Sequence, residues 1–84
     1  MQVKILYFAG LREALGCAGE TVELPVGVGN VGELRAFLSA RGDSWQTPLS
    51  RGNLRFAVNQ RMAGPESAIG PGDEVAFFPP VTGG

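Results

Sequence analysis

The C-terminal tail carries the clearest chemical feature of the sequence. It consists of the six residues that follow the last apolar stretch: Pro79, Pro80, Val81, Thr82, Gly83 and Gly84. The two prolines hold φ at about −65° and lack a backbone N–H, so a sheet ladder cannot continue through them and the tail should be stiff and extended. Because glycine has no Cβ, Gly83 and Gly84 can enter a narrow channel. We therefore expect the tail to present its terminal carboxylate to the active site of another protein.

The carboxylate of Gly84 is the group on which we expect chemistry. A free α-carboxyl group has a pKa of about 3.5, so it is ionised at neutral pH and is a poor electrophile. A partner enzyme could activate it with ATP as an acyl-adenylate, and a sulfur donor could then leave a thiocarboxylate. The chain would be substrate and carrier rather than catalyst. The alternative is a frayed tail that ends in glycine by chance. The order of strand, diproline, spacer and glycine favours a functional tail that is activated at Gly84.

The composition argues against catalysis by the chain alone. The sequence has no histidine, which removes the usual general base near neutral pH and every Ser/His/Asp or Cys/His arrangement. Its 8 acidic side chains are dispersed, so no carboxylate pair can be identified. The net charge is −1, the pI is about 5.2 and the basic residues are scattered, which indicates no nucleic-acid partner.

Size and hydropathy predict one small globular domain in the cytoplasm. The 84 residues are 44% hydrophobic and 18% charged, with no low-complexity run or internal repeat. Cys17 is the only cysteine, so we expect neither a disulfide nor a metal site, and no cofactor bound by the chain itself. No leader-like segment opens the sequence, and no apolar run is long enough to span a membrane. We therefore expect no membrane partner.

Three local features have both a functional and a structural interpretation. Residues 27–32 (GVGNVG) match the glycine pattern of dinucleotide-binding loops. The repeated βαβ units and the later acidic residue of such folds are missing, so we interpret the glycines as a loop before a helix. We interpret Trp45 as a lid at the edge of the core rather than a platform for stacking a base. No neighbour in sequence would lower the pKa of the Cys17 thiol, so we expect it to be inert.

Alternation and β-rich composition predict four strands and a short return strand: residues 3–8, 20–24, 54–59, a segment from Met62, and 74–78. Lys4 and Glu74 mark the outward faces of the first and last strands. Since side chains alternate along a strand, Phe8 and Phe78 should point outward as well. If these strands are neighbours, the two phenylalanines form one apolar patch beside the tail.

The spacing of polar and apolar residues predicts one main helix. Asn30, with Glu33 three residues later, forms a variant of the capping box before a helix that continues towards Gly42. A glycine at position 32, in the first helical turn, should lower helix stability by up to about 1 kcal/mol. A single helical turn is predicted over residues 11–15. Residues 43–53 are predicted to be irregular, because a proline and a glycine interrupt them.

The chain resembles the small subunit of molybdopterin synthase, a MoaD-type member of the ubiquitin-like sulfur carriers. The resemblance rests on residues 3–16 (VKILYFAGLREALG), 57–60 (AVNQ) and above all 72–84 (GDEVAFFPPVTGG). It implies an α+β, β-grasp fold: a mixed sheet wrapped over one main helix, with the first and last strands parallel at its centre. The β-grasp domain would span residues 1–78 and the extended diglycine tail residues 79–84.

The resemblance also implies a function. An E1-like enzyme that uses ATP and magnesium would adenylate Gly84, which would then be thiocarboxylated with sulfur from a sulfurtransferase or a cysteine desulfurase. The carrier would dock on the large synthase subunit, in a heterotetramer, and donate sulfur to cyclic pyranopterin monophosphate to make the molybdopterin dithiolene. The active site would lie mainly on that large subunit. The docking surface of the family corresponds to Phe8, Met62 and Phe78, and tail residues 79–82 would also contact the partner.

Three other functions remain open on the sequence alone. The chain could carry sulfur for thiamine thiazole or for tRNA thiolation, although its FFPPVTGG ending fits the thiazole carriers less well. It could be a modifier that is conjugated to lysines of other proteins through the same diglycine. It could also be a plain interaction module, for which the diglycine would be dispensable.

Overall fold

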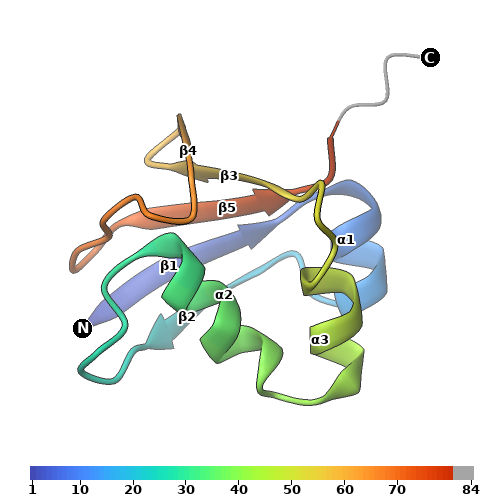
Figure 1. Ribbon diagram of the computed structural model, residues 1–84, viewed down its shortest axis with the longest axis horizontal. Helices are drawn as coiled ribbons and strands as arrows, with labels where there is room; N and C mark the ends of the chain where they lie inside the picture. The colour runs from blue at the N-terminus through green and yellow to red at the C-terminus, as the bar shows by residue number, and fades with distance from the viewer. Residues whose placement is uncertain (81–84) are drawn as a thin grey trace.

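The computed structural model describes residues 1–80, which form one mixed sheet and a set of helices (Figure 1). The elements in chain order are β1 (Gln2–Tyr7), α1 (Ala9–Leu15), β2 (Gly19–Glu23), α2 (Val31–Ser39), α3 (Asp43–Leu49), β3 (Arg55–Val58), β4 (Arg61–Ala63) and β5 (Glu74–Phe78). The strand order is β2-β1-β5-β3-β4; β1 and β5 pair in parallel, and the other neighbours pair antiparallel. The predicted α+β, β-grasp fold is confirmed.

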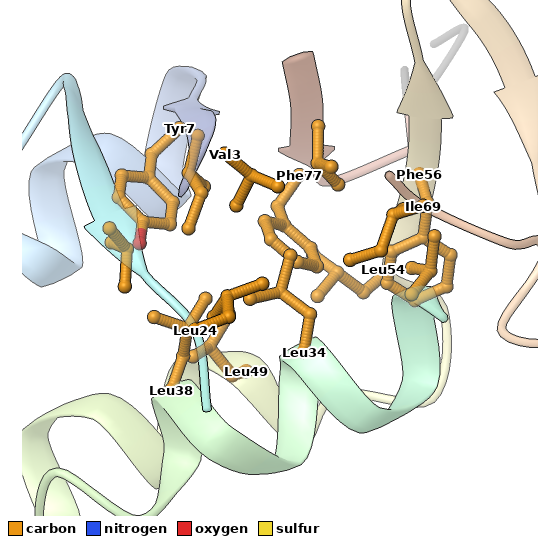
Figure 2. Close-up of a cluster of buried hydrophobic side chains, with 14 of the residues drawn as sticks. Val3, Tyr7, Leu24, Leu34, Leu38, Leu49, Leu54, Phe56, Ile69 and Phe77 are labelled. Carbon is orange, nitrogen blue, oxygen red and sulfur yellow. The ribbon is translucent and has the colours of Figure 1, made fainter. Parts of the chain in front are cut away.

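The core lies between the inner face of the sheet and the helices. Alternate residues of β1 are buried, and so are the inward residues Val75 and Phe77 of β5; these side chains meet the apolar side of α2, as the period of each element requires. In β5 the outward Ala76 is buried as well. Figure 2 shows Phe77 pointing from β5 towards Leu34 of α2. The Phe77 ring lies 5.6 Å from that of Phe56, edge-on, and 6.1 Å from that of Tyr7, stacked. These aromatic contacts join three neighbouring strands into one packed layer.

The start of α2 is fixed by the residues that predicted it. The Asn30 side chain accepts a hydrogen bond from the backbone N–H of Glu33 at 2.8 Å, and the Glu33 carboxylate accepts one from the N–H of Gly29 at 2.9 Å. At Gly32 the backbone N–H donates to the carbonyl oxygen of Pro65 at 2.7 Å, and a Cβ would lie only 3.1 Å from that oxygen. The glycine that weakens the helix therefore permits this close approach.

The helical boundaries differ from the prediction in three places. α1 spans seven residues rather than a single turn, and α2 ends at Ser39, before Gly42. The segment predicted to be irregular contains α3. Its proline, Pro48, lies in the last turn of α3, where it interrupts few of the helix hydrogen bonds. The guanidinium of Arg35 on α2 donates to the carbonyl oxygens of Leu49 and Arg51, and Leu49 is fully buried. These contacts with α2 thus stabilise α3. The local sequence of α3 does not encode them.

A polar network joins the sheet to the helical layer at the edge of the core. The hydroxyl of Tyr7 donates to the Glu20 carboxylate at 2.9 Å, and Arg41 binds the same carboxylate through two hydrogen bonds, at 2.7 and 3.0 Å. The Arg41 guanidinium lies 4.5 Å from the centre of the Trp45 ring, which meets Tyr7 edge-on. The prediction of Trp45 as a lid at the core edge is confirmed. The hydrogen bonds from Arg41, and secondarily from Tyr7, lower the pKa of Glu20.

Replacing Glu20 by glutamine should lower the free energy of unfolding at neutral pH by about 1 kcal/mol, because Arg41 loses its ionised partner. Since the folded-state pKa of Glu20 is depressed, its contribution is complete above the unfolded pKa of about 4.5 and is lost as the pH falls through the folded pKa. Urea titrations over falling pH should therefore show the difference between parent and E20Q shrinking in acid. E13Q, at an exposed position of α1, is the matched control. A pH-independent difference would contradict this account.

Candidate docking surface and tail root

One row of apolar residues crosses the outer face of the sheet. Strand register places Leu6 of β1 beside Ala76 of β5, Ala76 beside Ala57 of β3, and Ala57 beside Met62 of β4. These four side chains share a face, because residues paired in register point to the same side of the sheet. The row is a direct consequence of the strand order, which brings together four segments that are separate in the sequence.

The two outward phenylalanines extend this row into a patch. The N–H of Phe8 donates to the carbonyl oxygen of Phe77 at 3.2 Å, so Phe8 continues the line of β1 next to Phe78. Phe8 is 46% exposed and Met62 is 63% exposed, whereas Phe78 is half-buried. The structure therefore brings Phe8, Met62 and Phe78 onto one face, as strand parity predicted for the two phenylalanines.

A groove of about 380 Å³ lies in this face. Its walls are Leu6, Phe8, Ala57, Gln60, Glu74, Ala76 and Phe78. Sequence reasoning missed Ala57 and Gln60, which reach the groove only because β3 pairs with β5. Lys4 and Glu74 are opposite each other in register, two residues before Leu6 and Ala76, so charged groups lie on the side of the apolar row away from the phenylalanines. We call the apolar row, the two phenylalanines and this groove the outer patch.

The tail begins at one end of the outer patch. β5 ends at Phe78, and the half-buried Pro79 and Pro80 line a small cavity of about 130 Å³ with Leu11, Pro48 and Leu54. The first residues of the tail therefore lie against the domain, where the sequence had suggested that the tail leaves it at once. The remaining predicted site residues lie outside the described part of the chain: Val81, Thr82, Gly83 and Gly84.

The other sequence features have structural functions where the structure describes them. Cys17 is half-buried, and its thiol donates to the carbonyl oxygen of Gly19 at 3.4 Å. In the glycine-rich loop, the N–H of Gly29 donates its hydrogen bond to the carboxylate of Glu33, so it is not free to bind a phosphate. Residues 1–80 contain no cluster of three or more side chains suited to hold a metal ion. No helix in that range has the length and apolar character needed to cross a membrane.

Comparison with known proteins identifies relatives that match this chain over nearly its whole length. The pattern of the ThiS family matches residues 5–84. The molybdopterin synthase sulfur carrier subunits of Escherichia coli (strain K12) and Haemophilus influenzae are 42% and 40% identical to this chain over 82 residues, which cover 98% of this chain and 99% of each relative. The crystal structure of SAMP1 from Haloferax volcanii superposes with a TM-score of 0.71 at 30% identity, covering 100% of both chains.

The neighbouring residues Phe77 and Phe78 should respond differently to truncation. Phe77→Ala should cost about 3–5 kcal/mol of unfolding free energy, because its fully buried ring fills the core. Phe78→Ala should cost about 1 kcal/mol, since the Phe78 ring already lies partly in solvent. Equilibrium denaturation of the two variants measures the difference. Equal losses would show that the outer patch is part of the stability core.

Proposed function

The chain belongs to the ThiS family, and we propose that it is the sulfur carrier subunit of molybdopterin synthase. The observation that carries the proposal is the match, over nearly the full length, to relatives that have this name. In the proposed reaction the carrier donates sulfur to cyclic pyranopterin monophosphate, and two such transfers supply the two sulfurs of the molybdopterin dithiolene. Carriage for thiazole or tRNA thiolation remains an alternative; the names of these relatives favour molybdopterin.

The sulfur is carried on the C-terminal carboxylate of Gly84. One of its oxygens attacks the α-phosphorus of ATP on an E1-like partner, where magnesium is bound, and pyrophosphate leaves. A persulfide of the sulfur-donating enzyme then displaces AMP and forms an acyl disulfide. A thiol cleaves this disulfide, which leaves the thiocarboxylate on Gly84 and a disulfide between that thiol and the donor cysteine. A sulfurtransferase or a cysteine desulfurase is the source of the sulfur. The chain has no histidine, the usual general base near neutral pH. We therefore assign catalysis to the enzymes that the tail enters, and the chain is their non-catalytic carrier subunit, with no cofactor of its own.

The outer patch is the surface that docks on the large subunit. Burying an exposed phenylalanine contributes roughly 1.5–3 kcal/mol, so Phe8 and Phe78 together could anchor a partner. Pro79 and Pro80 follow directly, so a partner seated on the patch also lies at the start of the tail. Residues 79–82 would then extend across the partner and carry Gly83 and Gly84 to its active site. Two such carriers on a central dimer of large subunits make the heterotetramer.

A second candidate function is supported by one specific likeness. The Haloferax volcanii protein that superposes on this chain is called a small archaeal modifier protein. A modifier would use the same activated glycine, but the acyl group would pass to an amine of another protein and form an isopeptide bond. The two functions differ in what is transferred. A sulfur carrier transfers only its sulfur atom, whereas a modifier attaches its whole chain to the other protein.

The chain purified from its host should carry a C-terminal mass increase of about 16 Da, the exchange of one oxygen for sulfur. A variant that lacks Gly84 should show no increase and should yield no molybdopterin when it is reconstituted with the large subunit and the pyranopterin. Gln46→Ala, an exposed change on α3, serves as the control and should behave as the parent does. Isopeptide adducts without the mass increase would support the modifier instead. Full molybdopterin synthesis without Gly84 would contradict the sulfur-carrier function.

A substitution in the outer patch should weaken binding to the partner much more than it lowers the stability of the fold. Phe8→Ala should weaken binding to the large subunit by at least tenfold, because it removes an anchor that the partner would bury. It should change the free energy of unfolding by only about 1 kcal/mol, since Phe8 is 46% exposed in the free chain. Calorimetric titration and urea denaturation measure the two quantities. Unchanged affinity would remove the patch from the proposed interface.

A further inference from the structure

The turn between β3 and β4 places two non-glycine residues in left-handed backbone conformations. Asn59 has φ of 51° and Gln60 has φ of 68°, and they are the two central residues of a hairpin whose flanking residues Val58 and Arg61 are paired. A two-residue hairpin with both φ values positive is the common type I′ turn, in which the second position strongly favours glycine. Here glutamine occupies that position.

The left-handed conformation of Asn59 is compensated by contacts within the domain. Its side-chain oxygen accepts from the N–H of Glu74 at 3.0 Å, and its side-chain amide donates to the Asp73 carboxylate at 3.0 Å. Its own N–H donates to the carbonyl oxygen of Glu74 at 2.7 Å. The hydrogen bonds from Asn59 and from the N–H of Gly70 lower the pKa of Asp73, which keeps this acceptor ionised. The turn is thereby attached to the start of β5, and Gln60 must follow its geometry.

No comparable side-chain contact compensates the left-handed conformation of Gln60. Its side chain is exposed, and within residues 1–80 its carboxamide forms no hydrogen bond. A left-handed conformation is costly for a residue with a Cβ; such residues persist where the surrounding structure holds them, and they cluster at functional sites. Gln60 is also part of the groove wall, where Glu74 is the only other polar residue. The strained residue therefore adjoins the surface proposed for docking.

We propose that Gln60 is a binding residue for the large subunit, and that its carboxamide binds one backbone peptide group of the segment that fills the groove. This inference depends on the proposed function, because it assumes that the large subunit occupies the outer patch. A polypeptide that buries apolar side chains here must still satisfy its own N–H and C=O groups. The carboxamide offers one donor and one acceptor side, which matches a peptide group, whereas Glu74 can only accept. The left-handed backbone holds Gln60 at the groove.

The test measures affinity for the large subunit by calorimetric titration, and thermal stability of the free full-length chain. Gln60→Ala keeps a Cβ but removes the carboxamide, so it should weaken binding about 5–10-fold with little gain in Tm. Gln60→Gly should weaken binding equally, yet raise Tm by about 4 °C because the strain is relieved. Gln46→Ala removes an exposed carboxamide from α3 and should change neither quantity. This pattern would support the proposal.

The outcomes separate this inference from the proposed function. If Gln60→Ala binds as the parent does while Phe8→Ala binds weakly, the docking surface stands and the function of Gln60 is wrong. If Gln60→Gly does not raise Tm, the conformation is not strained and the proposal is overturned. If Phe8→Ala also binds normally, the partner does not use the outer patch, and both fail.

Discussion

The parallel pairing of β1 with β5 is the interaction on which the rest of the structure depends. It joins the beginning of the chain to its end at the centre of the sheet, with Tyr7 beside Phe77 on the inner face and Leu6 beside Ala76 on the outer face. β5 ends where the tail begins, so the same pairing that completes the core also fixes the position of the tail root. A shift of one residue in this register would exchange the two faces.

The two faces of the sheet therefore differ in burial. The inner face excludes water and supplies stability through tightly packed aromatic and aliphatic side chains. The outer face keeps an apolar surface in solvent, which contributes little to folding and is available for association. Phe77 and Phe78 are adjacent in sequence yet belong to different faces, because strand geometry directs successive side chains to opposite sides. Stability and docking can thus change independently.

In the proposed function, the domain positions the reactive group and partner enzymes act on it. The proposed reactive group is a carboxylate, which does nothing at neutral pH until another enzyme activates it. What the domain can contribute is a defined surface and a defined starting point for the tail: the outer patch, the diproline beside it, and Gln60 at the edge of the groove. The left-handed conformation of Gln60, imposed by the turn, places its side chain at that edge.

The sequence by itself determined the features that depend on neighbouring residues. The diproline and the diglycine restrict or free their own backbone, Asn30 caps the helix that follows it, and alternation along each strand predicts which side chains point outward. The β-grasp arrangement came from resemblance to a family, because pairing between distant strands has no local signal.

Only the tertiary structure decided the rest. α3 forms because Arg35 and the core stabilise a segment that the sequence predicted to be irregular, and Gln60 is strained because Asn59 attaches its turn to β5. In both cases the energy comes from residues far away in sequence, which periodicity and propensity cannot detect.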